Sequence, residues 1–84
     1  MTNTSSMAYA AIQPHLGPLQ ERIYKCLKAA GPLGLTDLEI QEQTGIKAQT
    51  QTPRRKELER MGLCKWNGHL RQTSIQKSKV WVAL

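Results

Sequence analysis

The sequence predicts one mainly helical α+β domain, in which a three-helix core is followed by a C-terminal β-hairpin. Three observations lead to this fold class: apolar residues recur at helical spacing after Pro18, a helix-capping motif begins at Thr36, and apolar and polar residues alternate from Leu63 onward. The chain has 84 residues, of which 39% are hydrophobic. That is enough for a single core but not for a second domain or a deep substrate cleft. We expect the domain to span residues 18–84, after an N-terminal tail over residues 1–17 with a possible short helix.

The first core helix is expected from Pro18, which suits a first helical turn, to a stop at Gly31-Pro32. Charged side chains lie on the other faces of this helix. The apolar residues with the helical spacing are Leu19, Ile23, Leu27 and Ala30. The segment 33–35 is too short for a helix and suits a brief extended stretch.

The second helix is expected to begin at a capping box. Here the Thr36 hydroxyl accepts from the amide of Glu39, and the Glu39 carboxylate accepts from the amide of Thr36. The helix runs to about Thr44 and ends at Gly45, which can adopt a left-handed conformation. The apolar residues expected to face the core here are Ile40 in the helix and Ile46 in the following turn.

The third helix is expected to begin between Gln49 and Thr52, because Pro53 is best tolerated in a first turn, and to end at Gly62. Its apolar stripe disappears in the N-terminal half. We therefore expect Leu58 and Met61 to anchor the C-terminal half, while the polar N-terminal half projects outward.

Two strands are expected after the third helix, over residues 63–66 and 79–84. The pair Asn67-Gly68 favours a tight hairpin turn, and a broader polar loop lies between the strands. Trp66 and Trp81 are expected to pack on the small core rather than to stack on bases.

Positive charge is concentrated in the second half of the chain. Twelve Lys and Arg against six Asp and Glu give a net charge of +6. Residues 1–46 carry three basic and four acidic residues, a net of −1, whereas residues 47–84 carry nine basic and two acidic residues, a net of +7. This excess favours a polyanionic partner, although basic surfaces also serve solubility.

Other classes of function have little support in the sequence. It has no Gly-rich phosphate loop and no evident pair of catalytic carboxylates, so we expect no enzyme activity and no cofactor. Cys26 and Cys64 lack paired CxxC spacing and are expected to be reduced core residues, and neither His15 nor His69 has further metal ligands nearby. Residues 1–20 contain no apolar run typical of a signal peptide or membrane span. We expect a cytoplasmic protein without a membrane partner.

The elements and their motifs occur in a family-specific order. The segments that carry the resemblance are residues 34–40, Thr44-Gly45-Ile46, residues 53–63, and Arg71-Gln72-Thr73 followed by Lys79-Val80-Trp81. Over about residues 20–84, the chain resembles the small winged helix-turn-helix DNA-binding domains of bacterial and phage proteins. The resemblance implies a double-stranded DNA-binding module, either a transcriptional regulator or a phage-type DNA-transaction protein. The third helix would enter the major groove and the wing would contact the backbone or the minor groove.

Side-chain chemistry then suggests roles within that arrangement. The candidates for reading base edges are Gln49, Thr50, Gln51 and Thr52. Arg54 and Arg55 are candidates for guanine or phosphate, and Thr36 and Lys47 for the DNA backbone. The wing candidates are Lys65, His69, Arg71, Lys77 and Lys79.

Several alternatives remain open for these residues. Arg54, Arg55 or Arg60 could instead pair with Glu57 or Glu59, and the lysines could be ordinary solvated residues. In the resembled family many members carry apolar residues where this chain has Gln51 and Arg55.

The sequence is also compatible with three other kinds of partner. A winged-helix protein-interaction adaptor is the alternative function, and the apolar residues it could use are Met7, Tyr9, Ile12 and Tyr24. RNA binding has less support because few aromatic residues are available for stacking. Homodimerisation, for example through residues 1–16, is open as well.

Overall fold

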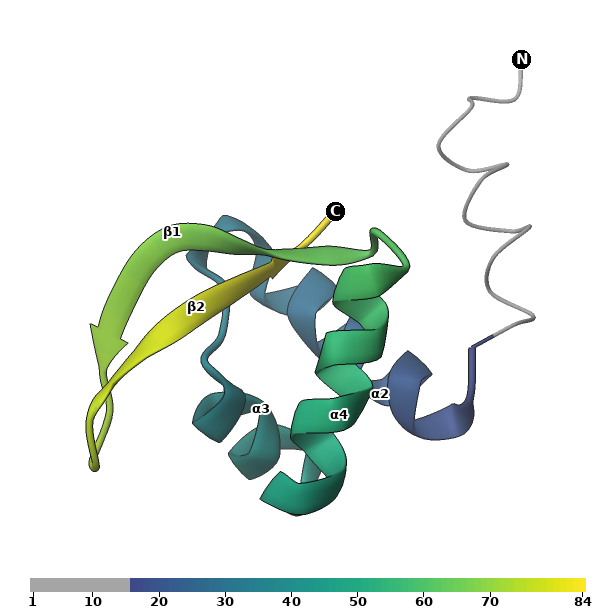
Figure 1. Cartoon of the computed structure of the whole chain (residues 1–84), viewed down its shortest axis with the longest axis horizontal. Coiled ribbons are helices and arrows are strands. Elements are labelled where there is room, and N and C mark those ends of the chain that lie inside the picture. Colours follow the sequence, from purple (N-terminus) through teal and green to yellow (C-terminus); the bar gives the residue numbers. More distant parts are fainter. Residues whose placement is uncertain (1–15) are drawn as a thin grey trace.

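The computed structural model describes residues 16–84, so the expected short helix in the N-terminal tail lies outside the described residues. Three helices precede a two-stranded antiparallel hairpin (Figure 1). The elements are α2 (Pro18–Ala30), the 3-10 helix η2 (Gly31–Leu33), α3 (Asp37–Thr44), α4 (Ala48–Arg60), β1 (Cys64–Gln72) and β2 (Lys77–Ala83). This mainly helical α+β arrangement confirms the predicted fold class and is consistent with a winged-helix layout.

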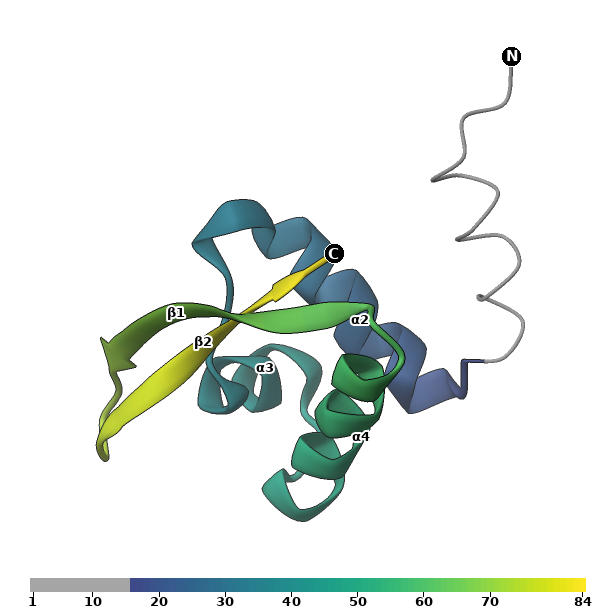
Figure 2. The same cartoon turned by 45° about the horizontal axis from the view of Figure 1, so that its top comes forward.

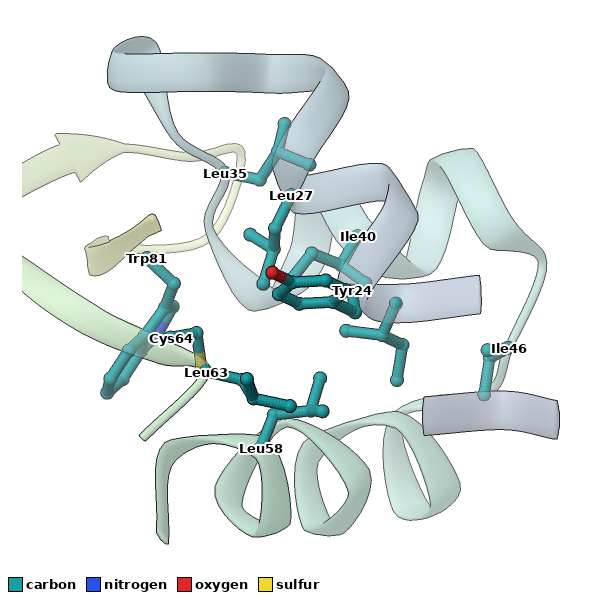
Figure 3. Packing of buried hydrophobic residues seen from close by; sticks show 10 residues of the cluster. Tyr24, Leu27, Leu35, Ile40, Ile46, Leu58, Leu63, Cys64 and Trp81 are labelled. Atoms are coloured by element: carbon teal, nitrogen blue, oxygen red, sulfur yellow. The ribbon is translucent and has the colours of Figure 1, made fainter. Parts of the chain in front are cut away.

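The core lies between the three helices and the base of the hairpin. Ile23, Leu27, Ile40 and Leu58 are fully buried and come from α2, α3 and α4. Figure 3 shows how Leu27, Ile40 and Leu58 lie within this core. The prediction that Met61 anchors the C-terminal half of the third helix in the core is wrong. Met61 is the C-cap residue of α4 and is 38% exposed. Leu63 takes that place in the core, and its amide donates to the carbonyl of Leu58.

The second helix has the predicted local chemistry at both ends. The amide of Glu39 donates to the Thr36 hydroxyl at 3.2 Å, and the amide of Thr36 donates to the Glu39 carboxylate at 2.9 Å. The helix ends at Gly45, which adopts a left-handed conformation with φ of 74°. The capping box, the inward Ile40 and the buried Ile46 are thereby confirmed.

The start of the third helix was predicted slightly too late. α4 begins at Ala48, so Pro53 lies inside the helix rather than in its first turn. Proline keeps a helical φ, but it lacks the amide donor and its ring crowds the carbonyl four residues earlier. Pro53 is on the exposed side of α4, where that carbonyl can tilt outward and accept from water. The constraint from proline was therefore weaker than assumed.

A short extended segment joins η2 to α3 and adds to the hairpin. The amide of Leu35 donates to the carbonyl of Trp81 at 2.9 Å, and the amide of Trp81 donates back at 2.8 Å. Gly34 permits this close approach: a Cβ there would lie 2.6 Å from the Trp81 carbonyl oxygen, at a φ of +70°. The segment fixes the hairpin to the helical core.

The hairpin turn is not at Asn67-Gly68, so that prediction is wrong. β1 continues through these residues to Gln72, and residues 73–76 connect it to β2. The register changes between the pairs Trp66–Trp81 and Leu70–Lys79, which marks a bulge around residues 67–69. The Asn67 side chain accepts from the amide of His69, so this Asn-Gly pair stabilises a bulge instead of reversing the chain.

The described helices include none that is long and apolar enough to cross a membrane.

Candidate nucleic-acid interface

A groove of about 400 Å³ runs between α3, α4 and the wing, which we define as β1, β2 and their connecting loop. We call it the polar groove after its charged residues, although Leu38, Ile75 and Trp81 also line it. Asp37 and Gln41 border it from α3, Arg55 from α4, and Lys77 and Lys79 from β2. Figure 2 shows α3 between α4 and the extended hairpin. Residues far apart in the sequence thus border one concave surface.

The outer face of α4 is polar and accessible. The side chains that point into the protein are Gln51, Arg55 and Leu58. At about 100° per residue, Gln49, Pro53, Lys56 and Arg60 lie on the opposite side of the helix, and all four are exposed. Thr50 and Thr52 flank this stripe and are half-buried. This is the only helical face of α4 that a large ligand could reach.

Gln51 is not available to read a base. Its side chain is completely buried. Its Nε2 donates to Asp37 Oδ1 at 3.0 Å, and its Oε1 accepts from Gln41 Nε2 at 2.9 Å. The structure therefore corrects the expected role: Gln51 is a buried polar link between α3 and α4 with its hydrogen bonds satisfied.

Arg55 is likewise a structural residue, with 5% of its surface exposed. Its Nε and Nη2 donate to the two carboxylate oxygens of Asp37 at 3.0 and 2.7 Å, and its Nη1 donates to Glu59 at 3.2 Å. The guanidinium carbon lies 3.8 Å from the centroid of the Trp81 ring. The arginine thus connects α3, α4 and β2, which corrects its expected role as a DNA contact.

Two more candidates hold the domain together. Thr36 is fully buried as the cap of α3, which leaves its hydroxyl no access to a DNA phosphate. Arg71 reaches from the wing to the helical core, where its Nη2 donates to the Leu33 carbonyl at 2.7 Å and its Nη1 to Glu39 and Gly34. Its side chain is partly exposed but its donors are largely occupied by the protein.

The alternative that an arginine of α4 pairs with Glu57 or Glu59 is confirmed for Arg54 and Arg55 but not for Arg60. Arg54 pairs with Glu57 at 2.8 Å, and Glu57 also accepts from Gln20 of α2. Arg60 has no acidic partner within 4.0 Å among the described residues. Arg54 therefore contributes to the contact between α2 and α4, while Arg60 is an exposed cation.

The remaining candidates occupy two different regions. Lys47, Gln49 and Lys77 are exposed at the N-terminus of α4 and along the wing, close to the polar groove or to the open face of α4. Lys65 instead borders a second groove with Lys28 of α2, and His69 is exposed on the bulge of β1. The thirteen predicted residues hence do not form one continuous surface.

Sequence reasoning missed Lys56 as a candidate. It lies two helical turns after Gln49, on the same exposed side of α4. The signal was present in the sequence, because a spacing of seven residues places two side chains on one helical face.

Unpaired cations are concentrated on α4 and the wing. In residues 16–84, five of the six acidic side chains form ion pairs, and they engage Lys25, Arg54, Arg55 and Arg71. Of the twelve basic residues this leaves eight without an acidic partner: Arg22, Lys28, Lys47, Lys56, Arg60, Lys65, Lys77 and Lys79. Six of these eight follow residue 46. The internal ion pairs therefore neutralise the acids and leave a positive surface on the second half of the domain.

The exposed apolar residues also differ from those expected. Tyr24, one of the candidates for a protein-docking patch, is buried in the core, whereas Met7, Tyr9 and Ile12 lie outside the described residues. Trp81 packs on the core as predicted, but Trp66 is 41% exposed and its ring is covered by the ammonium of Lys79. The prediction for Trp66 is therefore wrong.

The cysteines are free thiols. Cys64 is buried, as expected, and burial raises its pKa to about 11, whereas Cys26 is only half-buried, with a pKa raised by the same cause. In residues 16–84, no three His, Cys, Asp or Glu side chains lie close enough together to hold a metal ion.

No protein-family model matches this sequence, and no curated protein is similar to it.

Proposed function

We propose that this protein is a double-stranded DNA-binding module. In this proposal the exposed face of α4 enters the major groove, and the wing lies along the adjacent phosphate backbone. The observation that carries the proposal is the distribution of cations: six of the eight basic residues without an acidic partner in residues 16–84 lie on α4, at its N-terminus or in the wing. Such a surface attracts a polyanion and favours the release of its counterions.

The side chains on α4 support a base-reading role. Gln49 is exposed and can pair with the edge of adenine, while the Thr50 and Thr52 hydroxyls can serve several bases or phosphates. Lys56 extends the same face by two turns and can reach phosphate or guanine. The reading surface is therefore shifted from the predicted Gln51 and Arg55, which are buried, to their exposed neighbours.

The wing and the groove support backbone contact. Lys77 and Lys79 border the polar groove on the side opposite α3. A phosphate strand along this groove would meet these ammonium groups while the bases face α4. Regulation of transcription, or a phage-type DNA transaction, is the biological role we propose for such a module, together with the cytoplasmic location expected from the sequence.

The direct test is fluorescence anisotropy of a labelled mixed-sequence duplex, titrated with the protein from low to moderate salt. With five to seven phosphate contacts, the logarithm of the binding constant should fall against the logarithm of salt concentration with a slope of about −4.5 to −6. Duplex RNA and single-stranded DNA should compete poorly. No binding at low salt, or an affinity independent of salt, would refute the proposal.

Two single substitutions test whether the outer face of α4 is the surface that binds DNA. Lys56→Ala, on the outer face of α4, should reduce the magnitude of the salt slope by about one and weaken binding to all duplexes. Lys28→Ala is the matched control, because Lys28 is an equally exposed lysine without an acidic partner but lies on α2, beside the second groove. If the two variants lose affinity equally, binding is a property of the net charge and not of the α4 face.

The adaptor alternative is supported by one observation. The second groove, between α2, η2 and the hairpin, is lined in part by Leu27, Pro32, Trp66 and Val82, and exposes apolar as well as basic groups. If the protein fails to bind duplex DNA at low salt, this surface becomes the leading candidate for a partner protein.

A further inference from the structure

The second groove combines apolar surface with unbalanced positive charge. Its volume is about 530 Å³, within the range of about 300–1,000 Å³ typical of ligand pockets. The apolar surface comes in part from Leu27, Pro32 and Val82, and the two cations beside it are Lys28 and Lys65. Both lysines are exposed and have no acidic partner within 4.0 Å among the described residues. No described Asp or Glu lines the groove, so nothing there offsets their charge.

The second groove and the polar groove lie on opposite faces of the hairpin. Trp81 lines the polar groove, whereas the next residue, Val82, lines the second groove. Consecutive side chains of a strand point to opposite faces of the sheet. Val82 is paired with Lys65 of β1, so these two side chains share the face that turns away from the polar groove. Figure 2 shows the same division, with η2 on one side of the hairpin and α3 and α4 on the other.

The walls of the second groove are held in place in the free protein. Arg71 Nη2 donates to the Leu33 carbonyl at 2.7 Å, which ties η2 to the hairpin. The reciprocal backbone hydrogen bonds of Leu35 and Trp81 fix the segment after η2 to β2. Because these contacts exist before anything binds, a ligand need not supply the energy to order the groove.

The lining favours an anionic occupant that also has an apolar part. The two unpaired lysines attract negative charge, and the apolar surface favours an aliphatic side chain over water. Nucleic acid fits less well, because Trp66 is the only aromatic residue among those that line the groove, which leaves little surface for stacking bases. An extended protein segment with carboxylates on both sides of an apolar residue satisfies both features.

This chain does not supply such a segment itself. Residues 1–15 contain no Asp or Glu. Five of the six acidic residues already form ion pairs within residues 16–84, so a second copy of the chain offers only Glu42. Charge complementarity therefore selects a different protein as the occupant.

We propose that the second groove binds an acidic segment of a partner protein. An apolar side chain of that segment packs against Pro32 and Val82, and its carboxylates pair with Lys28 and Lys65. This inference goes beyond the proposed DNA-binding function and does not depend on it. The two grooves have no lining residue in common, so a filled second groove leaves the polar groove accessible. The protein then joins duplex DNA on one face of the hairpin to an acidic partner on the other.

The test selects peptides from a phage-displayed library of short random sequences, panned on the full-length protein. The enriched peptides are synthesised with a fluorophore and titrated by anisotropy at about 0.15 M salt, where the Debye length of about 8 Å screens distant charges. We expect the enriched sequences to carry Asp or Glu on both sides of an apolar residue. A library without enriched peptides, or enrichment of sequences that lack acidic residues, would overturn the inference.

Two double charge reversals decide where the peptides bind. Lys28→Glu combined with Lys65→Glu should weaken peptide binding by at least about tenfold, because two attractive pairs become repulsive. The matched control combines Lys47→Glu with Lys56→Glu, which also changes the net charge by 2 × 2 = 4 units, from +6 to +2, but on the α4 side. It should weaken binding by less than about twofold. Equal losses in the two variants would show attraction to net charge and refute the site.

Pro32→Ala tests the apolar contact. It should weaken peptide binding by about threefold through loss of part of the ring surface. Leu33→Ala is the control, because Leu33 is 72% exposed on the same 3-10 helix but does not line the groove, and it should leave binding unchanged. None of the substituted residues belongs to the buried core, so every variant should unfold near the wild-type temperature. Unchanged binding in Pro32→Ala would contradict the proposed contact.

Competition with nucleic acid separates this inference from the proposed function. Saturating duplex DNA should leave the affinity for the peptides within about threefold of its value without DNA. Displacement of the peptides by duplex DNA or by a single-stranded oligonucleotide would assign the second groove to nucleic acid and overturn the inference. If the protein does not bind duplex DNA at all, the proposed function fails, while the charge reversals still decide whether the second groove binds acidic peptides.

Discussion

Replacement of Arg55 by alanine should unfold the domain at a much lower temperature, although Arg55 has the sequence context of a DNA contact. The guanidinium donates to both carboxylate oxygens of Asp37 and to Glu59, and it lies against the ring of Trp81. Without it, the Asp37 carboxylate would remain in the interface between α3 and α4 with only the Gln51 amide as a side-chain donor.

The magnitude follows from the burial of the pair. Removal of one partner of a buried ion pair costs about 3–5 kcal/mol. Asp37 keeps 25% of its side-chain surface exposed, so water recovers part of that cost. The pair with the more exposed Glu59 adds little. We expect a loss of about 3 kcal/mol, or about 12–24 °C in Tm for a domain of this size.

The assay is thermal and urea unfolding, followed by far-ultraviolet circular dichroism and tryptophan fluorescence. Arg60→Ala is the matched control: it removes an exposed arginine of the same helix that has no acidic partner, and its stability should change by less than about 0.5 kcal/mol. Below its Tm, the Arg55→Ala variant should still bind duplex DNA with the salt slope of the wild type, because the buried Arg55 makes no phosphate contact in the proposed complex. A variant with unchanged Tm and greatly reduced DNA affinity would refute the structural role and restore Arg55 as a contact residue.

Three further substitutions or measurements address the scaffold. Gly34→Ala should destabilise the domain by about 2–4 kcal/mol in urea unfolding, because a Cβ there would lie 2.6 Å from a backbone carbonyl oxygen. Gly45→Ala has open space around its Cβ and should cost only about 1–2 kcal/mol. Equal losses of stability in the two variants would show that backbone conformation alone matters. Thr36→Ala should cost about 1–2 kcal/mol through loss of the helix cap, measured in the same way, and a neutral effect would contradict the capping role. A thiol reagent at pH 8 should label Cys26 in the native protein but Cys64 only on unfolding. Because burial raises the pKa of Cys64 from 9.0 to about 11, the neutral thiol is favoured in the folded state. The contribution of Cys64 to stability should therefore be constant below about pH 9 and be lost as the pH rises toward 11, and rapid native labelling of both thiols would contradict this burial.

The order and type of the elements could be predicted because each has a strong local signal. The capping box at Thr36 is a short-range pattern, and the termination at Gly31-Pro32 depends on backbone chemistry that tertiary contacts do not override. The turn at Asn67-Gly68 failed for the opposite reason. An Asn-Gly pair favours a tight turn, but it also suits a β-bulge. The pairing of β1 with β2 on both sides of residues 67–69 selects the bulge here.

The candidate site was harder to predict because the same polar residues can face inward or outward. Gln51 and Arg55 fall at positions where a helix of this kind would bury apolar side chains, and their polarity alone favours an exposed position. Both side chains are buried because Asp37, which lies 14 residues before Gln51 and 18 before Arg55, accepts a hydrogen bond from each of them. No helical periodicity reveals such a partner, since its position depends on how α3 crosses α4.

This buried polar cluster has a consequence for the proposed interface. Arg55 contacts Asp37 of α3 and Trp81 of β2, while Arg71 of the wing holds the capping carboxylate Glu39. The two arginines therefore fasten the wing to the same N-terminal turn of α3, one from each end of the hairpin. The relative positions of α4 and the wing are thereby fixed before DNA binds, and a ligand that contacts both need not supply the energy to orient them. Pairing with Asp37 and Glu39 thus draws two arginines away from the surface into structural roles. In the proposed interface, contact with DNA is left chiefly to lysines, Gln49 and the two threonines of α4.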